Sequence, residues 1–237
     1  MRDPENTSAR FDRFHSEYDE TLARGLSVSG EDRLYFARGR LAFLARCLRE
    51  AGLRPPFSVL DFGCGTGAAT PFFFEELGVE RLVGVDVSER SLEVARQRHG
   101  SESARFVALR DYSPRGQFPL AFCNGVFHHV PPPERAELVR LLRDSLSPGG
   151  LFSLWENNPS NPGTRYIMSR VAFDRDAVTL SSREAARMVA AGGLEVRRTD
   201  YLFIFPRALK ALRFLEPPLA KVPLGGQYQV LCRRPAV

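Results

Sequence analysis

Three alternate glycines between two acids form the clearest chemical pattern in this sequence of 237 residues. The stretch Val59–Gly67 reads Val-Leu-Asp-Phe-Gly-Cys-Gly-Thr-Gly, with Asp61 ahead of the glycines and Asp86 at the end of the next apolar run. The glycines are Gly63, Gly65 and Gly67. Glycine accepts a positive φ and has no Cβ, so the chain can turn tightly and offer bare backbone to a ligand. The pattern predicts a ligand site built from backbone and two carboxylates.

The two acids indicate which ligand this backbone would hold. The apolar runs 58–61 and 81–86 predict parallel strands, whose carboxyl ends form the edge where open α/β sheets bind ligands. A carboxylate at Asp86 can accept hydrogen bonds from both ribose hydroxyls of an adenosine. Asp61 would oppose a pyrophosphate but suit the ammonium of a methionine moiety. We therefore expect an adenosyl ligand that carries a methionine end.

A dinucleotide site is the main alternative. Gly63, Gly65 and Ala68 fit the permissive fingerprint of nicotinamide-binding folds, which would make the chain an NAD(P)-dependent reductase. The position of Asp61 and the additional Gly67 favour the adenosyl ligand instead. A glycine-rich turn that binds no ligand is the third interpretation.

The surrounding sequence alternates between strand and helix signals. Further strands are predicted at 105–109, 120–124, 151–155, 195–199 and 228–232. Helices are predicted from the glycine turn to Leu77, from Ser88 to His99, and over 133–145 and 182–191, and a turn at Pro148–Gly150. Strand–helix–strand units of this length give right-handed crossovers and a parallel sheet. We expect an α/β fold with a doubly wound, mostly parallel seven-stranded sheet.

Two further regions are expected to cover this sheet edge. Apolar residues at helical spacing predict a helical lid over 1–56, which leaves 57–237 as the ligand-binding domain. Within that domain, 157–180 is predicted as an irregular insertion and 201–227 as an apolar one, interrupted by prolines. The apolar insertion is consistent with a cap over a hydrophobic acceptor, a shallow peripheral membrane contact, packing on the sheet or a homodimer interface.

A family resemblance rests on five segments in order. Asp61–Gly67 resembles the signature of the class I S-adenosylmethionine-dependent methyltransferases. The segments that resemble the later motifs of this family are Val83–Ser88, Leu109–Tyr112, Asn124–Val130 and Leu146–Phe152. Leu120 departs from the pattern, because the family often has Asp there. The resemblance covers 57–156 and implies a Rossmann-like methyltransferase fold with S-adenosyl-L-methionine as cofactor and S-adenosyl-L-homocysteine as product.

The same resemblance assigns cofactor contacts residue by residue. Asp86 would bind the ribose hydroxyls, while Val87 would lie against the adenine. Asp111 and Tyr112 would meet the adenine edge and face, and Tyr35 would belong to the lid. The complete set implied for the cofactor is Asp61, Gly63, Cys64, Gly65, Gly67, Asp86, Val87, Asp111, Tyr112, Asn124, Gly125, Tyr18 and Arg40. A protein that binds this cofactor without catalysis is a further alternative.

Methyl transfer to a hydroxyl requires a base, and two histidines follow the fourth predicted strand. Histidine suits proton transfer at neutral pH, so His129, and after it His128, is the expected base. Either one could instead cap a helix or pack in the core. Glu156 follows the fifth strand, as a second base or an orienting group, with Asn157 and Asn158 beside it. These two asparagines would donate hydrogen bonds to the acceptor or form a rigid turn.

Composition limits the partners and the compartment. The formal charge is +5, but the arginines alternate with acids along helical stretches, so we expect no nucleic-acid partner. No apolar run approaches the roughly 20 residues of a membrane span, and no secretory signal is present, so a cytoplasmic protein is expected. The four cysteines lack metal-site spacing, and no metal is expected. The acceptor is expected to be a small, partly apolar metabolite, lipid or glycan precursor, methylated on oxygen.

Overall fold

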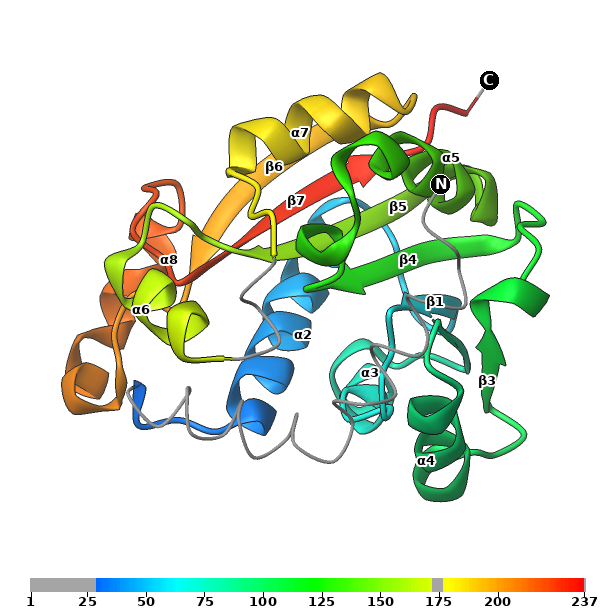
Figure 1. Cartoon of the computed structure of the whole chain (residues 1–237), viewed down its shortest axis with the longest axis horizontal. Helices are drawn as coiled ribbons and strands as arrows, with labels where there is room; N and C mark the ends of the chain where they lie inside the picture. Colours follow the sequence, from blue (N-terminus) through cyan, green and yellow to red (C-terminus); the bar gives the residue numbers. More distant parts are fainter. Residues whose placement is uncertain (1–28, 172–176, 237) are drawn as a thin grey trace.

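A seven-stranded sheet in the order β3-β2-β1-β4-β5-β7-β6 forms the centre of the molecule (Figure 1). The computed structural model describes residues 29–171 and 177–236. The strands are β1 Ser58–Phe62, β2 Arg81–Asp86, β3 Ala104–Ala108, β4 Phe118–Asn124, β5 Leu146–Asn157, β6 Glu195–Leu202 and β7 Gln227–Arg233. β7 runs antiparallel to both of its neighbours, whereas the other pairs are parallel. The predicted mostly parallel seven-stranded sheet is confirmed.

Helices cover both faces of this sheet. The α-helices are α2 Arg33–Glu50, α3 Thr70–Leu77, α4 Glu89–His99, α5 Arg135–Ser145, α6 Pro162–Arg170, α7 Ser182–Ala191 and α8 Glu216–Leu219. Short 3₁₀ segments are η2 Leu109–Asp111, η3 Phe127–His129, η4 Pro132–Glu134 and η6 Arg207–Leu215. One core cluster joins the sheet to α2, α3 and α4, and a second joins it to α5 and α7. Two helical layers therefore enclose the sheet, as a doubly wound fold requires.

Local sequence signals explain where the helices begin. The Asp32 side chain accepts a hydrogen bond from the Tyr35 backbone and caps α2. Ser88 caps α4 in the same way through the Ser91 backbone. Side-chain caps of this kind satisfy backbone donors that a helix start leaves unpaired, and each stabilises the fold by about 1 kcal/mol. The two caps therefore determine where α2 begins and where the loop after β2 gives way to α4.

The predicted N-terminal lid is described only in its second part. Residues 33–50 form α2, whose Leu41 and Leu44 are fully buried against the sheet. This helix is thus part of the core on that face of the sheet. Tyr18 lies outside the described residues. The division into a lid over 1–56 and a domain over 57–237 stays a prediction.

The structure departs from the predicted elements at two places. β5 starts at Leu146, which pairs with Phe118, and a register shift follows before Leu151 pairs with Leu120, so the predicted turn at Pro148–Gly150 is an irregularity inside β5 rather than a loop before it. The stretch 157–180 was expected to be irregular, yet it contains α6. The Asn161 side chain accepts a hydrogen bond from the Thr164 backbone and begins that helix. An Asn-Pro pair that reads as a turn is here a helix start.

None of the helices in 29–171 or 177–236 combines the length and the apolar character that crossing a bilayer requires.

Candidate functional site

The glycine loop lies at the point where the sheet reverses its strand order. β1 has β2 on one side and β4 on the other, so the chain leaves it in opposite directions for the two halves of the sheet. Ligands of open α/β sheets bind at such a switch point, at the carboxyl ends of the strands. Residues 63–67 follow the carboxyl end of β1 directly. The predicted site is therefore at the topologically expected place.

Two glycines in this loop are needed for different reasons. Gly63 has φ 76°, and a Cβ there would lie 2.2 Å from the Val126 side chain, so a close approach to the end of β4 excludes any other residue. Gly65 has φ 53°, but a Cβ there would meet nothing within 4 Å. Its bare backbone faces open space. This is the cradle that a bound ligand could fill.

Asp86 ties this loop to the end of β2. Its Oδ2 accepts a hydrogen bond from the Gly65 amide at 2.8 Å, and its Oδ1 accepts one from the Ser88 amide at 2.9 Å. Each carboxylate oxygen can accept more than one hydrogen bond. The carboxylate is therefore held in one orientation and can still accept hydroxyl donors from a ligand.

Asp61 is a buried acid on the other side of the loop. Burial, and then the negative charge of Asp86, raise the pKa of the Asp61 carboxyl to about 7, while the nearby Arg40 guanidinium acts in the opposite direction. Arg40 is itself buried, and its Nη1 donates to Gln227 Oε1 at 2.9 Å. Two acids that oppose each other's ionisation create a place where a cation would be stabilised.

Cys64 contributes its backbone to the loop. Its amide donates to the Val85 carbonyl at 3.2 Å, and its own carbonyl accepts from the Gly67 amide at 3.0 Å. The thiol packs over Gly84 on β2, where an added Cβ would lie 2.9 Å from the sulfur. Burial holds the pKa of this thiol well above its usual range. Cys64 is thus a neutral packing group beneath the loop.

The residues predicted for the adenine occupy the ends of β2 and β3. Val87 is partly exposed directly after β2, and the Asp111 carboxyl is exposed in η2 after β3. The Tyr112 hydroxyl donates to Ser145 Oγ on α5 at 2.8 Å. That bond directs the hydroxyl toward α5, so only the ring of Tyr112 is available to border a base.

At the end of β4 the site holds a buried histidine–glutamate pair. His128 Nδ1 lies 2.5 Å from Glu156 Oε2, and Glu156 Oε1 accepts the Phe127 amide at 2.8 Å. His128 is 5% exposed and Glu156 only 2%. A Cβ on Gly125, which follows Asn124 at the end of β4, would lie 3.6 Å from the His128 ring. The pair therefore borders the predicted methionine end.

This geometry favours His128 over His129 as the base. The two rings lie 4.0 Å apart, but the described contact with Glu156 is made by His128. A carboxylate on Nδ1 orients the ring and stabilises its protonated form. The sequence offered no reason to pair His128 with a residue 28 positions away.

The two asparagines at the end of β5 make hydrogen bonds within the protein. Asn158 is buried, donates to the Gly225 carbonyl at 2.8 Å and accepts the Ser160 amide at 3.1 Å. Asn157 Oδ1 accepts from Gln227 Nε2 at 3.2 Å. The rigid-turn interpretation describes Asn158 better than contact with an acceptor does.

Comparison with known proteins identifies the domain that carries this site. Residues 60–152 match the family model described as a methyltransferase domain. A trans-aconitate 2-methyltransferase from Sinorhizobium fredii is 29% identical over 135 residues, which are 57% of this chain and 52% of that protein. Its counterpart from Methylobacterium nodulans is 30% identical over 169 residues, 71% of this chain and 62% of that protein. Residues 60–152 thus form a methyltransferase domain, and the chain is similar to class I S-adenosylmethionine-dependent methyltransferases.

Solved structures agree with this methyltransferase fold. Magnesium protoporphyrin IX methyltransferase from Synechocystis PCC 6803, crystallised with S-adenosylhomocysteine, superposes with a TM-score of 0.64 at 14% identity. The match covers 98% of this chain and all of that one. A possible histamine N-methyltransferase from Thermotoga maritima gives 0.63 at 19% identity, over 96% and 99% of the two chains. The fold predicted for the methyltransferase is thereby confirmed.

The chain spans about half the length of the curated relatives it matches first. The family match nevertheless favours a methyltransferase over the NAD(P)-dependent reductase. It includes the glycine loop and His128 and ends before Glu156.

Two buried residues beside the pair of His128 and Glu156 belong to no motif that can be recognised in the sequence. The buried Arg135 donates to the Val130 carbonyl at 2.9 Å and to the Val178 carbonyl at 2.6 Å, which ties together two loops beside His128. Tyr228 is fully buried opposite Glu156 on β7. Their role depends on strand register, which a single sequence does not reveal.

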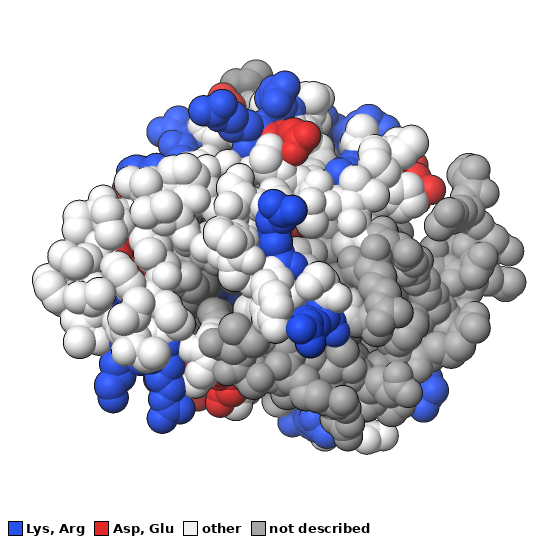
Figure 2. Space-filling view, turned by 60° about the vertical axis from the view of Figure 1, so that its left-hand side comes forward, with Lys and Arg blue, Asp and Glu red and all other residues white. Residues whose placement is uncertain are grey.

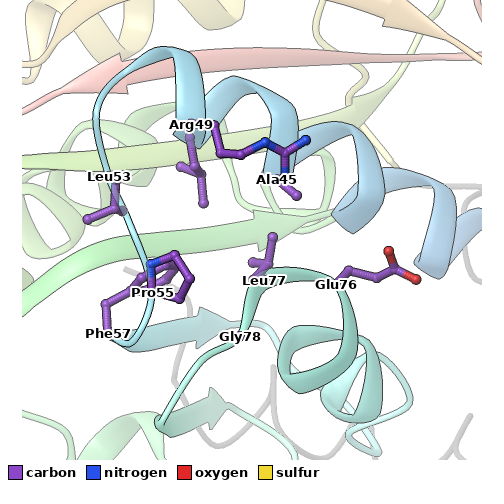
Figure 3. A pocket seen from close by; sticks show the side chains of 9 residues that line it. Ala45, Arg49, Leu53, Pro55, Phe57, Glu76, Leu77 and Gly78 are labelled. Carbon is purple, nitrogen blue, oxygen red and sulfur yellow. The ribbon is translucent and has the colours of Figure 1, made fainter.

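A separate pocket lies at the opposite edge of the sheet. Its volume is about 170 Å³, and it is bounded by the last turns of α2 and α3 and the loop into β1 (Figure 3). Its lining is Ala45, Leu48, Arg49, Leu53, Pro55, Phe57, Glu76, Leu77 and Gly78. None of these is a predicted site residue. Within the described part of the methyltransferase, His, Cys, Asp and Glu side chains form no group of three that could hold a metal ion.

Proposed function

We propose that this chain transfers the methyl group of S-adenosylmethionine to a hydroxyl oxygen of a small, partly apolar acceptor. The observation that carries this proposal is the open space over Gly65, between the carboxyls of Asp61 and Asp86. A ligand with a diol near one acid and an ammonium near the other suits this arrangement, and S-adenosylmethionine has both groups.

The cofactor side is assigned as follows. Asp86 accepts the ribose hydroxyls, and the Gly65 backbone lies under the ribose. Asp61 accepts the ammonium, whose charge lowers the pKa of this acid and favours its ionised form. The remaining assignments are Val87, Asp111 and the Tyr112 ring for the adenine, and Asn124, Gly125 and Arg40 for the methionine end. The proposal also includes a helical lid over 1–56 that covers the cofactor, with Tyr18 among the cofactor contacts.

The base is His128. In a neutral imidazole that donates from Nδ1 to Glu156, the lone pair lies on Nε2, so Nε2 is the basic atom. His128 Nε2 takes the hydroxyl proton of the acceptor as the oxygen attacks, and Glu156 stabilises the resulting imidazolium. When bound, S-adenosylmethionine supplies an electrophilic methyl carbon on a sulfonium, and the sulfur leaves as a neutral thioether. The protein's contribution beyond the base is to align the reacting atoms.

The relatives support a small acceptor and raise a carboxylate as the alternative. Several of them bear the name trans-aconitate 2-methyltransferase. A carboxylate is already ionised at neutral pH and needs no base to become a nucleophile. A general base is needed for a hydroxyl acceptor but not for a carboxylate. The buried pair of His128 and Glu156 therefore favours a hydroxyl over a carboxylate acceptor.

The test is a methyl-transfer assay with isotope-labelled S-adenosylmethionine, read by mass spectrometry. The acceptors are offered as matched pairs that share a carbon skeleton and carry either a hydroxyl or a carboxylate, with trans-aconitate included. We expect label on the hydroxyl members. Label on trans-aconitate alone would overturn the hydroxyl assignment. Tight binding of S-adenosylhomocysteine with no turnover of any acceptor would support a non-catalytic binding protein instead.

A further inference from the structure

The segment between β6 and β7 exposes large apolar side chains. In η6, Leu209 is 47% exposed, Leu212 39%, Phe214 72% and Leu215 37%. A 3₁₀-helix has three residues per turn, so Leu212 and Leu215 lie on one face. Beyond η6, Val222 and Leu224 are also exposed. We call Leu209, Leu212, Phe214, Leu215, Val222 and Leu224, together with Tyr166 on α6, the apolar surface.

Two charged side chains, Arg213 in η6 and Glu216 directly after it, contact the rest of the protein. Arg213 Nη2 donates to Glu31 Oε1 at 2.9 Å, and the guanidinium lies 4.7 Å from the centre of the Tyr35 ring. Glu216 accepts the Phe205 amide at 3.0 Å. Arg213 and Glu216 are thus partly buried, whereas Leu209, Leu212, Phe214 and Leu215 are exposed. The exposure of these large apolar side chains indicates that an apolar environment covers the outer side.

α6 extends the apolar surface. The Asn161 side chain, at the start of α6, donates to the Leu224 carbonyl at 2.7 Å. Tyr166 on α6 is 47% exposed, and the Arg170 guanidinium lies 5.0 Å from its ring centre. Figure 1 shows α6 and α8 together at the same end of the molecule.

The segments that form the apolar surface are rich in cations and contain one acid. Over 158–171 and 201–227 the sequence contains six Lys or Arg residues and one acid, the Glu216 already bonded to backbone. Exposed among the cations are Arg165, Arg170, Arg207 and Lys210. In Figure 2, which turns this end of the molecule forward, a broad uncharged area has Lys and Arg side chains along its lower edge. Apolar side chains bordered by cations complement a surface that is apolar inside and anionic outside.

The apolar surface lies beside the proposed site. β6 is antiparallel to β7, and β7 is antiparallel to β5, so β6 ends at the same edge of the sheet as β5. η6 follows that end of β6 after a short connection. An acceptor released from whatever covers the apolar surface would therefore arrive at the edge of the sheet where His128 and Glu156 lie.

We propose that the apolar surface docks on an anionic lipid bilayer. Leucine and aromatic side chains would enter the headgroup region, and the surrounding cations would pair with acidic headgroups. A second copy of this chain fits less well, because a symmetric contact would bring the cations of one copy close to those of the other. That the acceptor comes from the membrane rests on the proposed function, whereas the lipid contact itself does not.

The test is co-sedimentation of the full chain with vesicles at low salt. Vesicles of equal parts phosphatidylcholine and phosphatidylglycerol should bind the protein, and phosphatidylcholine alone should bind it at least about tenfold more weakly. The double variant Leu212→Ser/Phe214→Ser should lose binding to the anionic vesicles. Val196→Ser, another exposed apolar residue at the opposite edge, is the matched control and should keep it.

Charge reversal provides the second arm. Lys210→Glu/Arg165→Glu should weaken binding to anionic vesicles at least about tenfold, while Arg54→Glu at the far edge should not. No sedimentation with anionic vesicles, or equal binding by the wild type and both double variants, would overturn the proposal. A dimer in solution that Leu212→Ser/Phe214→Ser disperses, without vesicle binding, would assign the surface to a second copy. Affinity for S-adenosylhomocysteine should be unchanged in all variants, so failure here leaves the proposed function standing.

Discussion

The cofactor side and the acceptor side of the site are held by different kinds of contact. On the cofactor side, the Gly63 amide donates to the Val85 carbonyl and Asp86 binds two amides of nearby loops. On the acceptor side, side chains far apart in the sequence meet, as His128 does with Glu156. The first arrangement is set by backbone conformation and the second by side-chain identity. Substitutions on the acceptor side can therefore change the acceptor without disturbing the cofactor.

The largest effect should come from His128→Gln on the acceptor side. We expect kcat to fall about 100- to 10,000-fold, because the hydroxyl proton loses its acceptor. The dissociation constant of S-adenosylhomocysteine should stay unchanged, since the cofactor side is untouched. Steady-state kinetics and calorimetry measure the two quantities. His129→Gln is the matched control, and an equal loss of kcat in both variants would contradict the assignment of His128.

On the cofactor side, Gly65→Val should weaken binding of the cofactor product. Its side chain would fill the open space over the loop, so affinity for S-adenosylhomocysteine should fall at least about 100-fold. The strain of a positive φ costs only about 1–2 kcal/mol of unfolding free energy. Gly52→Val is the control, because Gly52 has φ 85° and equally open surroundings away from the site. Equal affinities in the two variants, measured by calorimetry, would place the cofactor elsewhere.

Asp61 should make cofactor binding depend on pH. Its pKa of about 7 means that the acid must lose a proton to receive an ammonium. Affinity should rise up to about tenfold per pH unit below about pH 7 and then level off, with proton release seen by calorimetry in two buffers. Asp61→Asn should bind more weakly and without this slope. A pH-independent affinity of the wild type would rule out this role of Asp61.

The same acid should affect stability with the opposite trend. The folded carboxyl keeps its proton up to about pH 7, whereas the unfolded one loses it near about pH 4. The folded state therefore binds more protons between these values, and this group's contribution to the unfolding free energy falls as pH rises through that window. Asp61→Asn should remove that fall in denaturant titrations.

Asp200→Asn should have the smallest effect on function. Asp200 is fully buried and pairs with Arg198 at 2.6 Å and with Lys221 at 2.7 Å. Its loss should lower the unfolding free energy by about 2 kcal/mol, because two cations lose a charged partner. Affinity for S-adenosylhomocysteine should not change, since β6 lies at the far end of the sheet. A loss of affinity without a loss of stability would contradict this expectation, because it would show that β6 is coupled to the cofactor site.

The sequence predicted the parts of the structure that follow from local pattern. Apolar runs and glycines placed all seven strands and the loop after β1, because strand period and positive φ are properties of short segments. It failed at β5 and α6, where pairing with Phe118 and the cap by Asn161 decide the start of the element.

Side-chain pairs across the sheet were beyond sequence reasoning. The preference for His129 rested on position alone, whereas His128 is the one in contact with Glu156. Arg135 and Gln227 had no motif, and their contacts depend on how α5 and β7 pack. Such pairs arise only once tertiary packing is known.

A crystal structure with S-adenosylhomocysteine tests the placement of the cofactor most directly. We expect the ribose over Gly65, with both hydroxyls within hydrogen-bond distance of the Asp86 carboxylate and the ammonium beside Asp61. The nucleotide bound anywhere else, for example in the pocket beside Leu53 and Phe57, with the space over Gly65 unfilled, would contradict the proposal.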